Sequence, residues 1–158
     1  MPAKPLSPRE LRIWHAFVSM AEDVLERVGR DIARATGLSG PEFGVLSRIA
    51  AYGRGEMRQQ DLATVMAWEK SRLSHQLSRM EERNLIERRL GKGRATLVAL
   101  TKIGREKLAL ALPIRAESVR RNLLARLTPE QIDTIIRVSN LLGEEQSQVD
   151  PQASRTAD

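Results

Sequence analysis

An unbroken heptad seam near the N-terminus constrains the fold of this chain more than any other feature. Apolar residues recur there at alternating steps of three and four, the spacing of one face of a long α-helix. They are Leu11, Trp14, Val18, Ala21, Leu25, Val28, Ile32 and Ala35. Ser7-Pro8-Arg9-Glu10 forms a capping box before the seam, and Gly37 follows it as a left-handed cap. The pattern predicts one helix over residues 8–36.

A helix of this length exceeds what one small lobe can cover. At about 1.5 Å per residue it spans roughly 40 Å, so much of its apolar face needs a partner. That partner is either a long helix of a second subunit or the chain's own C-terminal helices, and the sequence leaves both open.

Positive charge is concentrated in one third of the chain. Residues 54–105 hold 12 Lys or Arg against 6 Asp or Glu, whereas the remaining residues balance at 14 against 14. The whole formal net charge of +6 therefore lies in this segment, as expected of a surface that faces a polyanion. Aromatic residues make up only 3% of the chain, too few to stack on many unpaired bases. Duplex DNA is therefore the favoured nucleic-acid partner.

Composition excludes several other classes of protein. The chain has no Cys, which rules out disulfides, thiolate metal sites and thiol redox sensing. His15 and His75 are the only histidines, so no metal site is predicted. Signal-peptide and membrane-span patterns are absent, which predicts a cytoplasmic protein with no membrane partner. No nucleophile elbow, P-loop, zincin motif or dinucleotide turn occurs, so neither enzymatic activity nor a cofactor is expected.

Three shorter helices are predicted after the seam. A second capping box, Ser39-Gly40-Pro41-Glu42, opens the first of them, which ends near residues 52–55. The others cover residues 59–66 and 70–83, and Asn84 follows as a cap. The residues expected to face the core are Phe43, Leu46, Ile49, Ala50, Leu62, Val65, Met66, Leu73, Leu77 and Met80.

The second half of the chain is predicted to contain a hairpin and two further helices. Strands over residues 85–89 and 96–100 flank a Gly-containing basic tip. The next helix, over residues 102–125, should be kinked or split by Pro113. Thr128-Pro129-Glu130-Gln131 is a third capping box and opens the last helix. The polar tail, residues 147–158, is expected to be disordered.

The exposed face of the 70–83 helix has the chemistry needed to contact base edges in the major groove. Arg72 can bond a guanine through two donors, and His75 and Gln76 can bond purine edges. An ordinary solvated helix face is the alternative, but the position between a short helix and a basic hairpin favours DNA binding. The candidate residues are Lys70, Ser71, Arg72, Ser74, His75, Gln76 and Arg79.

The basic hairpin supplies a second set of candidates. Arg94, with Lys92, is suited to a narrow minor groove, where negative potential is concentrated. Arg88 and Arg89 are expected to reach phosphates, which would position the protein without recognising sequence.

The order of elements resembles the MarR family of bacterial transcriptional regulators over nearly the whole chain. The matching pieces are GLSGPEFGVLSRIA, RQQDLA, the recognition helix SRLSHQLSRMEERNLIER and the wing end RATLVALTKIGREKL. Leu100-Thr101-Lys102-Ile103-Gly104 matches the LT-x-x-G closure of the family, its most specific signature. Lys92 departs from the pattern, because the family usually has an acid there that pairs with the arginine matched by Arg94. Asn84 replaces the usual Gly cap.

The resemblance implies a mainly α fold with a small β-hairpin wing. Residues 8–36 and 105–146 would be dimerisation helices, and residues 39–104 the winged helix-turn-helix lobe. The homodimer would bind a pseudo-palindromic operator and repress genes until a small aromatic or anionic effector intervenes. Family members often bind effectors between the dimerisation helices and the DNA lobe. The candidates to line that crevice are Trp14, His15, Phe17 and Phe43.

A basic helical adaptor that binds an acidic protein is the alternative function. It would use the positive surface but not the wing.

Overall fold

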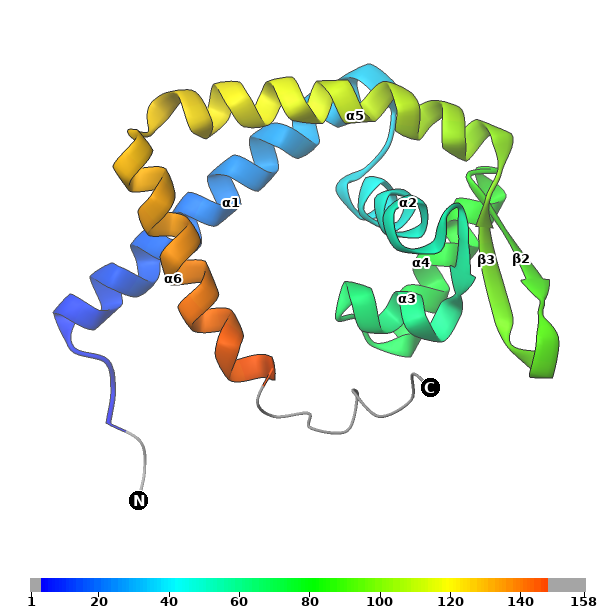
Figure 1. Cartoon of the computed structure of the whole chain (residues 1–158), viewed down its shortest axis with the longest axis horizontal. Helices are drawn as coiled ribbons and strands as arrows, with labels where there is room; N and C mark the ends of the chain where they lie inside the picture. Colours follow the sequence, from blue (N-terminus) through cyan, green and yellow to red (C-terminus); the bar gives the residue numbers. More distant parts are fainter. Residues whose placement is uncertain (1–3, 148–158) are drawn as a thin grey trace. The chain divides into compact units, whose positions relative to one another are not determined.

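The computed structural model describes residues 4–147 of the chain, which divides into two compact units. One unit extends to Val119 and the other begins at Arg120. The first is mainly helical with a small antiparallel sheet, which confirms the predicted fold class (Figure 1).

Helix α1 spans Pro8–Thr36, as the seam predicts. The amide of Ser7 donates to the Glu10 carboxylate at 2.7 Å, and the amide of Glu10 donates to Ser7 Oγ at 3.3 Å. Gly37 ends the helix with φ 71°. Along the seam, Ile32 near this end is 2% exposed, whereas Leu25 in the middle is 71% exposed.

Helices α2 (Gly40–Gly53), α3 (Gln59–Met66) and α4 (Lys70–Glu82) lie beside the sheet (Figure 1). The predicted core residues Leu46, Ile49, Leu62, Leu73, Leu77 and Met80 are fully buried. Burial was wrongly expected for Ala50 and Val65, which are exposed. Val45 and Ala63 are buried instead. A short helix packs only one side against the core, so some of its apolar residues remain at the surface.

The sheet has three strands rather than the two of the predicted hairpin. Strands β2 (Ile86–Leu90) and β3 (Thr96–Leu100) pair as expected, and β1 (Glu56–Arg58) adds to the other edge of β3 in the order β1-β3-β2. The sequence does not reveal β1, because three residues are too few to show an alternating pattern.

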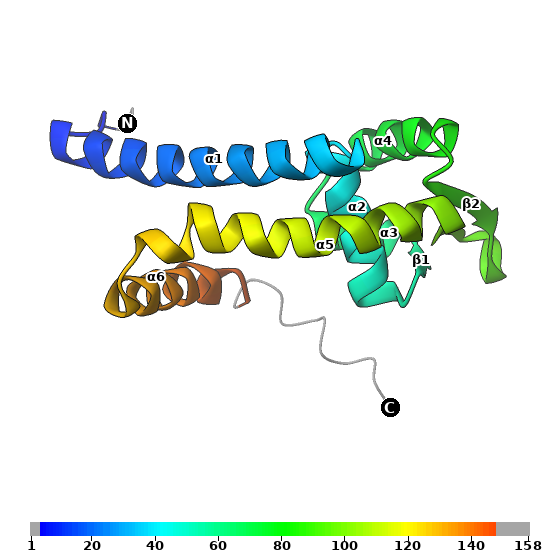
Figure 2. The same cartoon turned by 90° about the horizontal axis from the view of Figure 1, so that it is seen from above.

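Helix α5 (Lys102–Asn122) follows β3 and contains Pro113 without a break in the helix assignment. The expected split at this proline is therefore wrong. Pro113 lies on the exposed side, where a carbonyl that has lost its helical partner can face water. Lys107 Nζ donates to Thr36 O at 2.5 Å, and Ser118 Oγ donates to Asp31 Oδ2 at 2.6 Å. These bonds hold α5 against the C-terminal part of α1 (Figure 2).

The second unit contains a 3₁₀ turn (Leu124–Arg126) and helix α6 (Pro129–Ser147). The predicted third capping box is present, since the Thr128 amide donates to Gln131 Oε1 at 2.9 Å and the Gln131 amide donates to Thr128 Oγ1 at 3.4 Å. Apart from Ser147, the predicted disordered tail lies outside the described residues. Across residues 4–147, no helix has the length and apolar character to cross a bilayer.

The LT-x-x-G closure joins α5 to the junction of α4 and β2. Thr101 Oγ1 donates to Asn84 O at 2.6 Å and accepts from the Gly104 amide at 3.0 Å. A Cβ atom at Gly104 would lie 2.0 Å from Leu85 O. Only glycine allows this close approach, which accounts for the last residue of the signature.

Gly104→Ala is expected to lower the free energy of unfolding by about 1–3 kcal/mol, because the added methyl group meets backbone that cannot swing away. Chemical denaturation followed by circular dichroism measures the change. Gly40→Ala is the control, since nothing lies within 4 Å of a Cβ there. Equal stability of the two variants would contradict the close approach at Gly104.

Candidate nucleic-acid interface

A tight turn and a buried apolar stripe position α4. Ala67 adopts φ 51°, and the amide of Trp68 donates to Ala63 O at 3.0 Å, which ends α3 and redirects the chain. Leu73, Leu77 and Met80 then fix α4 to the core with 0% exposure. The opposite face of α4 is left at the surface, in a helix-turn-helix arrangement.

The exposed side of α4 carries most of the predicted contact residues. Lys70, Ser71, Arg72, His75 and Arg79 are exposed, and Ser74 is half-buried. Gln76 departs from the prediction, because it is only 7% exposed and its Oε1 accepts from Arg79 Nη2 at 3.1 Å. Gln76 therefore orients Arg79 and does not offer its amide to a base edge.

The tip of the wing is a basic turn, as predicted. Residues Lys92–Arg94 form a 3₁₀ turn between β2 and β3, and the Gly91 amide closes it by donating to Ala95 O at 2.8 Å. Gly93 and Arg94 both adopt the left-handed conformation, with φ 68° and 61°. Lys92 and Arg94 are exposed.

The two arginines of β2 are engaged within the chain. Arg88 Nε donates to Glu81 Oε2 at 2.8 Å, and its Nη2 donates to Ser78 Oγ at 3.0 Å. Arg89 forms an ion pair with Glu56. Contact of both side chains with phosphates stays a prediction, and within the chain both are paired with acids. Their role here is to join β2 to α4 and to β1, so these ion pairs brace the wing along β2.

Recognition-helix and wing candidates meet at a cavity of about 320 Å³. Lys70 at the start of α4 and Arg94 at the wing tip line it, and Arg58, directly before α3, adds a third cation. Sequence reasoning missed Arg58, although a cation directly before a helix that opens a helix-turn-helix was an available signal. No acid whose side chain the structure describes, within residues 4–143, forms an ion pair with these three side chains. The cavity thus suits a backbone phosphate.

The four predicted effector residues lie on two different helices, three on α1 and Phe43 on α2. Trp14 and Phe17 lie near the N-terminal end of α1, with 55% and 51% exposure, and His15 beside them is exposed. Phe43 lies in α2, beyond the other end of α1, and at about 1.5 Å per residue that end is roughly 30 Å from Phe17 along the helix. The Arg115 guanidinium lies 5.6 Å from the centroid of the Phe43 ring.

A different cavity, of about 340 Å³, lies between α2 and α5. Arg48 and Arg115 provide positive charge, Tyr52 provides an aromatic face, and Leu108 and Leu112 provide apolar walls. Ser47 also lines it, and the Ser47 hydroxyl is buried without a hydrogen-bond partner among the described residues. This lining suits a small amphipathic anion. No three His, Asp or Glu side chains of the described residues form a metal-binding group.

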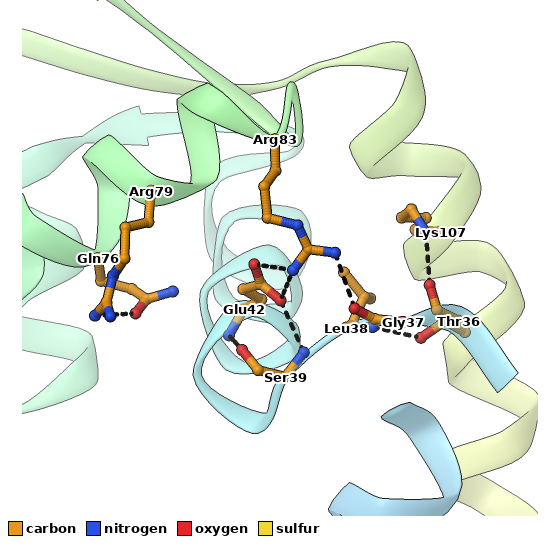
Figure 3. A network of polar contacts seen from close by, with 9 residues as sticks. All are labelled: Thr36, Gly37, Leu38, Ser39, Glu42, Gln76, Arg79, Arg83 and Lys107. Carbon is orange, nitrogen blue, oxygen red and sulfur yellow. Dashed lines mark hydrogen bonds and ion pairs between the residues drawn. The ribbon is translucent and has the colours of Figure 1, made fainter. Parts of the chain in front are cut away.

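The C-terminal end of α4 is tied to the corner between α1 and α2 (Figure 3). Arg83 Nη1 donates to both carboxylate oxygens of Glu42, at 2.5 and 2.6 Å, and Nη2 donates to Gly37 O at 2.9 Å. Glu42 is 4% exposed and also accepts from the Ser39 amide at 2.8 Å. One buried carboxylate therefore caps α2 and holds the residue that follows α4.

Protonation of Glu81 is coupled to folding through Arg88. Hydrogen bonds from Arg88 hold the pKa of Glu81 below its ordinary value, against a smaller opposing effect of burial. The ionised carboxylate thus stabilises the fold at a pH above the unfolded-state pKa, and this contribution disappears as the pH falls through the folded-state pKa.

Glu81→Gln is expected to lower the free energy of unfolding by about 0.5 kcal/mol at neutral pH. The difference from wild type should shrink below about pH 4. Urea denaturation over a pH series measures it, with Glu82→Gln, at the neighbouring exposed position, as the control for loss of one charge. A difference that stays constant with pH would show that the carboxylate of Glu81 is not responsible.

A sequence profile described as a domain of unknown function, DUF7343, matches residues 44–101, from α2 through β3. No curated protein sequence matches the chain. Among solved structures, AbsC, a MarR family transcriptional regulator from Streptomyces coelicolor, is 28% identical with a TM-score of 0.81, over 92% of this chain and 99% of AbsC.

Two further structures are similar. Sco3205, a MarR family transcriptional regulator from Streptomyces coelicolor in complex with DNA, is 26% identical with a TM-score of 0.81, over 90% of this chain and 91% of Sco3205. The organohalide-sensing regulator RdhR-CbdbA1625, in its 2,4-dichlorophenol-bound form, is 19% identical with a TM-score of 0.75, over 99% of this chain and 92% of that one, and shares the fold. The resemblance to the MarR family is confirmed, and the similar structures are of transcriptional regulators rather than enzymes.

Proposed function

We propose that this chain, a relative of the MarR-family transcriptional regulators, is a homodimeric, effector-responsive repressor that binds a pseudo-palindromic operator in the cytoplasm. The single observation that carries DNA binding is the meeting of α4 and the wing around unpaired cations. Lys70, Arg94 and Arg58 surround one cavity, and the exposed donors of α4 lie beside it. A helix that can enter the major groove, beside a positively charged cavity that can bind a backbone phosphate, is an arrangement suited to recognition of duplex DNA.

Uncovered apolar surface supports the dimer. In the single chain, α1 leaves Leu11, Trp14, Phe17 and Leu25 at 40–71% exposure. Helix α6 likewise exposes Ile136, Leu141 and Leu142. Surface of this kind along whole helices marks a protein interface. We assign residues 8–36 and 105–146 to that interface, with a second copy of the chain as the partner.

The cavity between α2 and α5 supports effector binding. Its two arginines, one tyrosine and two leucines match an aromatic anion better than the four residues proposed from sequence. The 2,4-dichlorophenol-bound regulator of the same fold is a precedent for an aromatic ligand, though not for this site.

Selection of genomic fragments by the purified protein, followed by footprinting, tests the proposal. The repressor is expected to protect two half-sites about one helical turn apart and to retain them against random competitor DNA. An adaptor for an acidic protein would lose all DNA equally to the competitor, and that result would reject the proposed function.

Arg72→Ala and Arg94→Ala are expected to have different effects on DNA binding, the first on base preference and the second on overall affinity. The first should relax base preference at one position of each half-site and cost about 1–3 kcal/mol of binding. The second should weaken binding to all sequences and reduce the steepness of the salt dependence. Competition binding on single-base operator variants, repeated over a salt series, separates them. Identical effects of the two substitutions would remove the distinction between helix and wing.

Leu25→Glu is expected to dissociate the dimer while leaving the monomer folded, because Leu25 is 71% exposed in the single chain. Sedimentation velocity measures the assembly, and circular dichroism checks the helices. Arg27→Glu, outside the seam, is the control and should remain dimeric. An unaltered dimer with Leu25→Glu would place the interface elsewhere.

A further inference from the structure

Arg72 and Trp68 form a stacked pair at the start of the recognition helix. The Arg72 guanidinium carbon lies 4.3 Å from the centroid of the Trp68 ring. Trp68 stands in the turn before α4, and Arg72 lies in the first turn of α4. Tryptophan is the best aromatic partner for a guanidinium, and the contact strengthens when water is excluded.

The tryptophan side of the pair is anchored. Trp68 is half-buried and packs against the buried core cluster. Its amide donates to Ala63 O at 3.0 Å, and the preceding residue, Ala67, is locked in the left-handed conformation that ends α3. The ring is therefore a fixed platform against which an exposed arginine can be held.

The contact with Trp68 does not use up the hydrogen-bond donors of Arg72. The indole ring presents its π face to the guanidinium and no lone pair, so the five N–H donors remain available to other acceptors. Among the acids of residues 4–143, whose side chains are described, none forms an ion pair with Arg72. Arg72 therefore keeps its full set of donors while losing much of its rotational freedom.

Arg79, on the same helix, is held by a hydrogen bond from one of its own donors. Its Nη2 donates to Gln76 Oε1 at 3.1 Å, which occupies one of the donors that a base edge would need. Of these two arginines, only Arg72 is both pre-oriented and fully available. That difference singles it out for recognition of a base.

We propose that Trp68 is a positioning residue that fixes the Arg72 guanidinium for two hydrogen bonds to O6 and N7 of a guanine in each half-site. This assignment rests on the proposed DNA-binding function. Restricting the guanidinium before binding reduces the conformational entropy lost in the complex. Discrimination for guanine at one position is thus shared between a residue that touches the base and a residue that does not.

The test compares wild type, Trp68→Leu, Trp68→Phe, Arg72→Ala and the Trp68→Leu/Arg72→Ala double variant. Each binds the selected operator and a copy in which the guanine assigned to Arg72 is replaced. Trp68→Leu is expected to reduce the preference for guanine about two- to five-fold, and Trp68→Phe should restore part of it. The double variant should match Arg72→Ala alone, because Trp68 acts only through Arg72.

Met66→Leu is the matched control, since Met66, like Trp68, is half-buried beside the turn between α3 and α4 and packs against the core cluster. It should leave base preference unchanged. The positioning role is overturned if Trp68→Leu weakens both DNAs equally, tightens binding, or adds its effect to that of Arg72→Ala. If Trp68→Leu does not fold, Trp68→Phe alone decides, by loss or full retention of guanine preference.

Failure of the proposed function has a separate signature, in which wild type itself does not prefer the operator over competitor. In that case the stack is still measured by the emission of Trp68 in a Trp14→Phe background, which removes the only other tryptophan. Arg72→Ala should shift that emission. An unchanged spectrum would show that the two side chains do not stack, which also overturns the positioning role.

Discussion

The buried carboxylate of Glu42 is the interaction on which the arrangement of the DNA-binding lobe depends. It is 4% exposed, caps α2 through Ser39, and receives two bonds from Arg83. Leaving a buried charge without its partner costs several kcal/mol of folding free energy. The start of α2, which holds Ser39 and Glu42, therefore cannot easily separate from Arg83 at the end of α4. Because Arg83 also bonds Gly37 O, the end of the recognition helix is positioned directly against the corner between α1 and α2. The link between that corner and α4 thus consists of an ion pair and a hydrogen bond, both made by Arg83.

The arginines of the lobe divide into two groups by what surrounds them. Arg83, Arg88 and Arg89 pair with acids of the same chain and hold α4, β2 and β1 together. Arg72 and Arg94 have no acidic partner among the described residues and project from the recognition helix and wing. The net positive charge of the segment is thus a poor guide to which cations face DNA. Ion pairing separates structural cations from those available to a ligand.

Local signals in the sequence predicted most of the helices. The capping boxes at Ser7, Ser39 and Thr128 and the left-handed positions at Gly37 and Asn84 depend on neighbours within a few residues. The site was harder to predict, because the burial of Gln76 and the pairing of Arg89 with Glu56 depend on packing between separate elements. Strand β1 was not predicted for a related reason, since it is defined by its pairing with β3, which is distant in sequence. Sequence periodicity predicts which face of a helix is apolar, but it does not predict which charged side chains of separate elements form ion pairs.

The conformation of Arg94 has a consequence for the stability of the wing. A side chain in the left-handed region costs roughly 1–2 kcal/mol relative to glycine, and Arg94 adopts φ 61° directly after Gly93 at 68°. Glycine at position 94 would relax the turn but would carry no cation. The tip therefore keeps a charge at the rim of the cavity at a cost in backbone stability. Screens for thermostable variants should accordingly recover substitutions here that fold better and bind nucleic acid less well.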